Sequence, residues 1–133
     1  MALLLTGQRH SLSDAIAHQD GRPQIVPRSL KKARAYLEAH AAEPLDLDQL
    51  ARACGTGIRS LQLGFRRHYG RSISEALLDI RLNHLRQHLT TSAADSRVID
   101  IAFDLGFTHL SRMAKAYQIK FGERPSDTLR QAR

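Results

Sequence analysis

The sequence predicts an all-α protein with two helix-turn-helix subdomains joined by a long central helix, about seven helices in total. Three observations support this fold. No segment alternates apolar and polar residues with the period of a β-strand. Apolar residues recur instead at helical spacing along most of the chain. One pattern also occurs twice, about 50 residues apart, which indicates two copies of one supersecondary unit.

The repeat consists of small, apolar and glycine residues at matching positions. Each copy has an alanine, a glycine four residues later and then an apolar pair four residues apart. The residues are Ala51, Gly55, Leu61 and Phe65 in the first copy, and Ala102, Gly106, Met113 and Tyr117 in the second. The alanine permits close helix approach, and the glycine can adopt the positive φ that ends a helix. The apolar pair buries one face of the following helix and turns its other faces outward.

Residues 1–26 are expected to be an N-terminal arm or the tail of something larger, because they could not form a core alone. A short helix capped by Ser11 or Ser13 could bury Leu12, and residues 19–23 have the composition of a turn or linker. The main domain is expected to span residues 27–133.

The first subdomain is expected to contain three helices. An amphipathic helix begins at Pro27 and ends at about Ala41, before Glu43-Pro44. Asp46 caps the next helix, residues 47–54. The outward helix of the first copy follows the glycine turn and spans residues 58–68.

A long central helix is expected next, capped by Ser72 or Ser74 and ending at about Leu89. Its length of about 16 residues corresponds to about 24 Å. With packing on each side, it could hold the two outward helices about 34 Å apart, which is one turn of DNA.

The second copy follows a polar loop. Asp95 or Ser96 is expected to cap a helix over residues 97–105. The second outward helix spans residues 109–121, and Ser126 caps a last short turn.

The charge balance favours a polyanionic partner. The chain has 20 Lys and Arg against 13 Asp and Glu, and its pI is about 10.3. Residues 49–74 contain five arginines and no acid, and residues 105–122 contain Arg112, Lys115 and Lys120 and no acid. Two acid-free basic runs on outward helices indicate a DNA-binding surface.

Several other classes of function find little support. The single cysteine, Cys54, excludes an internal disulfide and fits a reducing cytoplasm. No apolar run approaches a membrane span, so a nucleoid-associated cytoplasmic protein is expected. His84 and His88 have the spacing of two metal ligands, but no third ligand accompanies them. We therefore expect no metal, no cofactor and no enzyme.

The second copy, IAFDLGFTHLSRMAKAYQIKFGERPS (Ile101 to Ser126), resembles the signature of the AraC/XylS family of bacterial transcription regulators. The first copy, LARACGTGIRSLQLGFRRHYG, resembles that family's N-terminal helix-turn-helix. The resemblance covers residues from Pro27 to the C-terminus. It implies a seven-helix domain in which both helix-turn-helix subdomains face DNA, and an activator that recruits RNA polymerase.

The resemblance also bears on the rest of the protein. Longer family members carry a preceding sensor domain, and residues 1–26 are similar to the end of such a domain plus its linker. An effector ligand, if there is one, would be bound by a domain outside this chain. The chain departs from the family at Gly57, where a Ser or Thr cap is usual, at Ile73, where Pro is common, and at Lys115, where Arg is common. Met113 and Tyr117 also replace two common phenylalanines.

The first outward helix has a stripe of candidate base-reading residues opposite Leu61 and Phe65. This first stripe follows the i, i+3, i+4, i+7 rule and contains Arg59, Gln62, Leu63 and Arg66. Arg can pair with guanine, Gln with adenine, and Leu can contact a thymine methyl. These are also the base-reading positions that the resemblance implies, and the sequence has no acid within the stripe or one helical turn from it. Phosphate contacts are expected from Arg67, His68 and Arg71. The alternative is a solvent-exposed face of salt-bridging arginines.

The second outward helix has a weaker stripe. This second stripe contains Ser111, Ala114, Lys115 and Gln118, of which the first three are expected to contact bases. Backbone contacts are expected from His109, Arg112, Gln118 and Lys120. The alternative is a subdomain that anchors the DNA backbone and reads little sequence.

The sequence thus predicts a sequence-specific double-stranded DNA-binding transcription regulator. Helices 58–68 and 109–121 would read two successive major grooves. Two alternatives remain: a truncated or stand-alone regulator that occupies sites without activating, and a basic helical module that binds acidic proteins.

Overall fold

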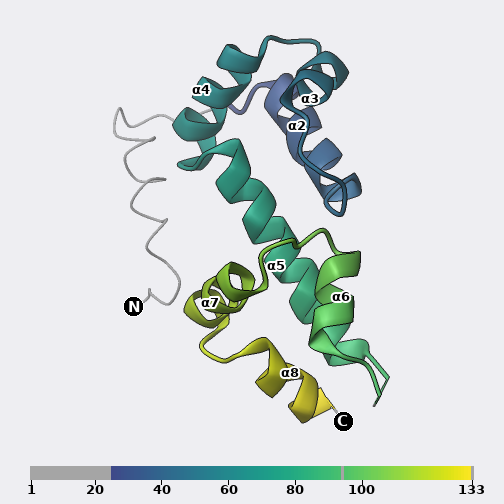
Figure 1. Ribbon diagram of the computed structural model, residues 1–133. Coiled ribbons are helices and arrows are strands. Elements are labelled where there is room, and N and C mark those ends of the chain that lie inside the picture. The colour runs from purple at the N-terminus through teal and green to yellow at the C-terminus, as the bar shows by residue number, and fades with distance from the viewer. Residues whose placement is uncertain (1–24, 94, 133) are drawn as a thin grey trace, which may run out of the picture. The chain divides into compact units, whose positions relative to one another are not determined.

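The computed structural model describes residues 25–93 and 95–132. These residues form seven helices and no strand, so the all-α prediction is confirmed (Figure 1). The helices are α2 (Arg28–Ala39), α3 (Leu47–Cys54), α4 (Ile58–Tyr69), α5 (Ile73–Thr91), α6 (Val98–Asp104), α7 (Leu110–Phe121) and α8 (Pro125–Ala132). Residues 1–24 are not described, so most of the expected arm at residues 1–26, including the helix capped by Ser11 or Ser13, lies outside the described residues.

The described residues form two compact units. The first unit comprises residues 25–39 and 46–76, and the second comprises residues 40–45 and those from Leu77 onward. Each unit therefore contains one of the two repeats that the sequence predicts. The helix α5 starts in the first unit and continues in the second.

The first unit packs α2, α3 and α4 around a small hydrophobic core. As predicted, the Asp46 carboxylate caps α3 by accepting a hydrogen bond from the Gln49 N–H at 3.1 Å. Gly55 ends the helix with a φ of 71°. The core residues are Leu30, Ala33 and Leu37 from α2, Leu50, Ala51 and Cys54 from α3, and Leu61 and Phe65 from α4.

The helix α5 begins with a capping box. The Glu75 N–H donates to Ser72 Oγ at 3.1 Å, and the Ser72 N–H donates to Glu75 Oε1 at 2.7 Å. Ser72 is therefore the cap, and Ser74 is not. The helix has 19 residues, slightly more than predicted.

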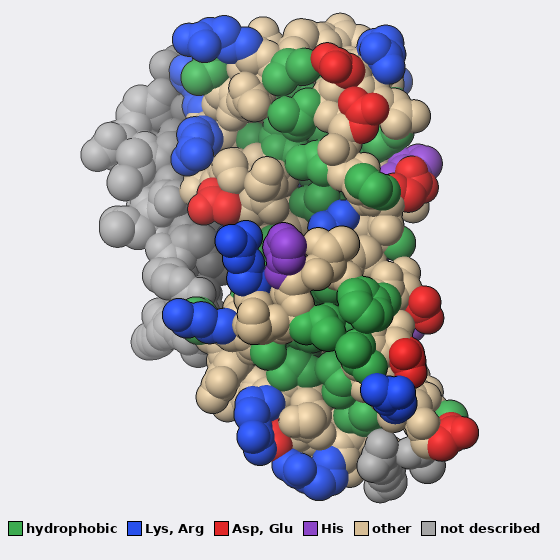
Figure 2. Space-filling view, viewed as in Figure 1, with side chains coloured by type: hydrophobic (Ala, Val, Ile, Leu, Met, Phe, Trp, Pro, Cys, Tyr) green, Lys and Arg blue, Asp and Glu red, His purple; other side chains and the backbone are tan. Residues whose placement is uncertain are grey.

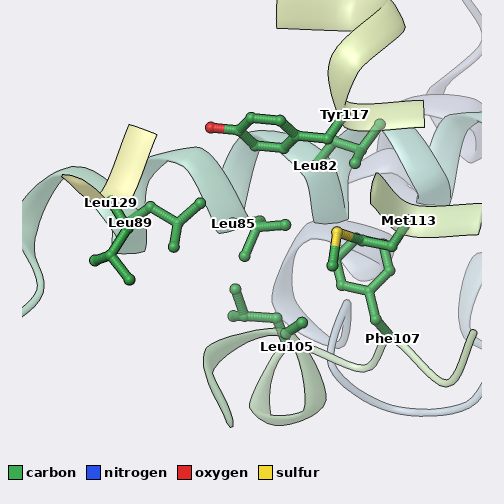
Figure 3. Close-up of a cluster of buried hydrophobic side chains, with 9 residues drawn as sticks. Leu82, Leu85, Leu89, Leu105, Phe107, Met113, Tyr117 and Leu129 are labelled. Atoms are coloured by element: carbon green, nitrogen blue, oxygen red, sulfur yellow. The ribbon is translucent and has the colours of Figure 1, made fainter. Parts of the chain in front are cut away.

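The second unit has one hydrophobic core, drawn in Figure 3. Leu82, Leu85 and Leu89 project from α5 toward side chains of the second helix-turn-helix. The other core members are Ala102, Leu105, Phe107, Met113, Tyr117 and Leu129. The Tyr117 hydroxyl donates to Thr128 Oγ1 at 2.7 Å, which ties α7 to α8. Burial of Tyr117 raises the pKa of its phenol.

Two predicted caps in the second unit are wrong. Arg97 occupies the N-cap of α6 without a side-chain hydrogen bond, so neither Asp95 nor Ser96 caps this helix. The predicted last turn is the eight-residue helix α8, which begins at Pro125. Ser126 lies inside this helix and therefore does not cap it, and the Asp127 carboxylate accepts a hydrogen bond from the Arg124 N–H at 3.1 Å. Hydrogen bonds from Arg124 lower the pKa of Asp127 to about 2.

Candidate nucleic-acid interface

The first stripe lies on the exposed face of α4. Arg59, Gln62 and Arg66 are exposed, and Leu63 has 57% of its surface exposed. Leu61 and Phe65 are 1% and 0% exposed on the opposite face. Because this packing fixes the rotation of the helix about its axis, the stripe points outward as predicted.

The stripe also lines a groove with a volume of about 340 Å³. The same groove is lined by Leu47 at the start of α3 and by Ser72, Ile73 and Ser74 at the start of α5. Apolar side chains and cationic side chains thus meet in one depression of the first unit. The sequence did not identify these four residues as part of the site, because only folding brings the beginnings of α3 and α5 next to α4.

The fold adds an acid to the surroundings of the first stripe. The sequence has no acid within one helical turn of the stripe, but Glu75 at the start of α5 lies near Arg66 and Arg71. The pKa of Glu75 is lowered, mainly by the hydrogen bond from the Ser72 N–H and also by these two cations. An acid therefore lies at the edge of the cationic groove.

The residues expected on phosphates flank the end of α4. Arg67 is exposed, whereas His68 and Arg71 are half-buried. His68 Nδ1 is buried and has no hydrogen-bond partner within the described part of the chain. Arg67 and His68 lie in the last turn of α4, and Arg71 follows Gly70, which ends the helix.

The second stripe lies on α7 opposite Met113 and Tyr117, which are buried. Ser111, Lys115 and Gln118 are exposed, and Ala114 is half-buried. His109 and Arg112 are exposed at the start of the helix.

Lys120 differs from the other predicted backbone contacts. Its Nζ is 2.5 Å from Asp79 Oδ1 and 5.5 Å from the centre of the Phe121 ring. The run of residues 105–122 contains no acid in sequence, but the fold brings Asp79 from α5 to it. An intramolecular ion pair therefore competes with any phosphate for this ammonium group.

The surface in Figure 2 has hydrophobic side chains exposed beside Lys and Arg side chains. Within residues 25–93 and 95–132, no three His, Cys, Asp or Glu side chains gather to hold a metal ion. None of the described helices combines the length and hydrophobicity that a membrane span requires.

The Cys54 side chain is buried. Desolvation raises the pKa of its thiol, and the positive charge of Lys32 opposes this with a smaller effect.

Two helix-turn-helix units, each with an exposed helix that carries basic and amide side chains, define a DNA-binding protein. Residues 50–131 match the model of a family described as a helix-turn-helix domain. The chain belongs to the AraC/XylS family and contains the helix-turn-helix DNA-binding domain of that family. The resemblance noted in the sequence is thereby confirmed.

A solved structure supports the same assignment. The crystal structure of a probable AraC family transcriptional regulator from Rhodopseudomonas palustris superimposes with a TM-score of 0.75 at 30% sequence identity. The match covers 80% of this chain and 99% of that one.

Two curated relatives are longer proteins. The probable thc operon regulatory protein of Rhodococcus erythropolis is 40% identical over 106 residues, which are 79% of this chain and 32% of that protein. The XylDLEGF operon transcriptional activator of Pseudomonas putida is 35% identical over 106 residues, 79% of this chain and 33% of that protein. The chain thus spans about a third of the length of these relatives.

Proposed function

We propose that the chain is the DNA-reading part of a transcriptional activator and that α4 and α7 read two successive major grooves. The observation that supports this most directly is the first stripe. Its two arginines and one glutamine are exposed on one face of a helix whose other face is buried in the core. Arg and Gln are the side chains best suited to bidentate pairing with guanine and adenine.

Activation is proposed from the relatives. The Pseudomonas putida protein is an operon transcriptional activator, and it shares the DNA-binding part with this chain. We infer that bound protein recruits RNA polymerase. An effector, if there is one, would be bound by a sensor domain outside this chain, and residues 1–26 would be the end of that domain and its linker.

The test compares specific and random duplex DNA. The specific site is first obtained by selection from a randomised library, and affinities are then measured by fluorescence anisotropy. Arg59→Ala and Gln62→Ala should each weaken binding to the selected site by about 1–3 kcal/mol, and binding to random DNA much less, because base contacts are lost only on the correct sequence.

Arg67→Ala provides the matched control. This arginine lies on the same helix but is expected to contact phosphate, so its loss should weaken binding to both DNAs to a similar extent. Equal losses on both DNAs for Arg59→Ala would show that the first stripe contacts phosphates and does not read bases. Binding that is insensitive to salt would favour the alternative of a protein-interaction module.

A further inference from the structure

Leu63 is an exposed leucine among the polar members of the first stripe. It has 57% of its surface exposed, whereas Leu61 and Phe65 on the other face of α4 are buried. A single exposed leucine is common on protein surfaces and indicates nothing by itself. Leu63 differs from such a residue because it lines a groove to which two other helices contribute further apolar side chains.

The groove lies entirely within the first unit and has both apolar and cationic walls. Leu47 at the start of α3 is half-buried, and Ile73 at the start of α5 is 3% exposed. Together with Leu63 they form the apolar part of the lining. Arg59 and Arg66 line the same groove. A ligand that fits this lining presents an apolar group and carries negative charge beside it.

Helix caps hold the apolar walls in place. The bond from the Gln49 N–H to the Asp46 carboxylate fixes the first turn of α3, which contains Leu47. The capping box of Ser72 and Glu75 fixes the first turn of α5, which contains Ile73. The groove is therefore formed in the free protein, and little ordering of these residues opposes binding.

The major groove of DNA offers one apolar group at the edges of its bases, the 5-methyl group of thymine. All other groups at these edges are hydrogen-bond donors and acceptors. 5-Methylcytosine carries a methyl group at the same position of the ring. The phosphates of the duplex supply the negative charge that the two arginines attract.

We propose that Leu63, Leu47 and Ile73 form a subsite for the 5-methyl group of one pyrimidine in the α4 half-site. Leu63 is then a specificity-determining residue that contacts the methyl group directly. Binding depends on thymine at this position and responds to methylation of a cytosine that replaces it. This inference rests on the proposed reading of bases by α4, and all of its residues belong to the first unit.

The first experiment replaces thymines of the selected α4 half-site by deoxyuridine, one at a time. Deoxyuridine keeps every hydrogen-bonding group of thymine and lacks only the methyl group. At one position the wild type should lose about fourfold in affinity, the amount expected for burial of one methyl group. Leu63→Ala should bind the two sites to within about 1.5-fold of each other, because the surface that receives the methyl group is gone. An unchanged preference in Leu63→Ala would overturn the proposal.

Two further variants test whether the groove, and not leucine content alone, carries the preference. Leu78→Ala is the matched control, because Leu78 is an exposed leucine of α5 that does not line the groove. It should keep the full preference for thymine, and its loss there would overturn the proposal. Leu47→Ala shortens one wall and should reduce the preference to about twofold. An undiminished preference in Leu47→Ala would overturn the groove as the site. Melting temperatures of all variants exclude loss of folding as the cause.

The second experiment separates the two sources of the methyl group. The thymine–adenine pair at the sensitive position is replaced by cytosine–guanine, with and without the 5-methyl group on the cytosine. The wild type should bind the methylated site about fourfold more tightly than the unmethylated one. Leu63→Ala should bind both alike. No gain from the methyl group in the wild type would overturn the extension to 5-methylcytosine.

The same measurements distinguish failure of this inference from failure of the proposed function. If no thymine of the selected α4 half-site is sensitive to deoxyuridine while the wild type still prefers the selected site to random DNA, only the methyl subsite is overturned. Equal binding of the wild type to selected and random DNA would contradict the proposed function, and this inference with it.

Discussion

Gly64 determines how closely α4 approaches α2. A Cβ atom at this position would lie 2.9 Å from Leu30 Cδ2 and 3.0 Å from Leu30 Cδ1. Leu30 is 3% exposed, so its side chain has little room to turn away. A glycine in the middle of a helix normally lowers stability by about 1 kcal/mol relative to alanine. At this position the absence of a side chain allows α4 to pack closely against Leu30.

Gly64→Ala should therefore destabilise the wild-type protein by about 1 kcal/mol, because overpacking costs about 1–3 kcal/mol and exceeds the gain in helix propensity. In a Leu30→Ala background the clash is gone, and the same substitution should stabilise by about 1 kcal/mol. Urea unfolding of the four proteins measures this double-mutant cycle.

The control is Gly64→Leu, which should be far more destabilising than Gly64→Ala in the wild-type background. A higher melting temperature for Gly64→Ala together with a harmless Gly64→Leu would contradict the crowding. A glycine in the middle of a helix predicts close packing against a neighbouring helix, because its conformational cost needs a structural reason, and the contact with Leu30 agrees with this. Identifying Leu30 as the neighbour requires the folded structure.

At the scale of the element, the start of α5 serves two purposes. Ser72 and Glu75 form the capping box, and Ser72 also lines the groove beside the first stripe. Glu75 places a negative charge near Arg66, which is a candidate base reader. A residue that stabilises the helix thus opposes the approach of a polyanion.

Glu75→Gln separates these two effects. Gln can retain the capping box, so helix stability should change little. Binding to duplex DNA should tighten by about 0.5 kcal/mol at low salt, the scale of an exposed ion pair, and the gain should fade as salt screens the charge. Affinities at several salt concentrations measure this.

Glu38→Gln, which removes an exposed acid of α2, controls for the change in net charge. Unchanged or weaker binding of Glu75→Gln would show that Glu75 does not act on the bound DNA.

Local signals account for what the sequence could predict about the elements. The helical spacing of apolar residues and the Asp46 cap predict α3 with the bounds that the structure has. Both signals depend only on residues close together in the sequence. The period also predicts which side chains form the first stripe. The acids Glu75 and Asp79 could not be placed beside Arg66 and Lys120 in this way, because those contacts depend on tertiary packing. The α6 cap was predicted wrongly because a polar loop offers several candidate residues and the fold uses none of them.

At the scale of the whole molecule, the two outward helices differ in what they present to DNA. The first stripe has three exposed side chains that can distinguish bases by hydrogen bonding and one exposed leucine. The second stripe has Lys115 as its only charged member, beside a half-buried Ala114. Lys120 is drawn into an ion pair with Asp79. Lys lacks the planar fork with which Arg pairs bidentately with guanine.

We therefore expect unequal half-sites, with the α4 half-site tolerating few base changes and the α7 half-site contributing mainly through phosphates. A good bidentate contact is worth about 1–3 kcal/mol of discrimination, so three such candidates against one lysine should separate the half-sites clearly. Selection from a randomised library measures the information content at each position. Lys115→Arg should add a guanine preference to the α7 half-site, whereas Arg112→Lys, which keeps the charge of an expected phosphate contact, should leave both the base preference and the salt dependence nearly unchanged. Equal half-sites, or a richer α7 half-site, would instead indicate recognition of DNA shape or water-mediated contacts by α7.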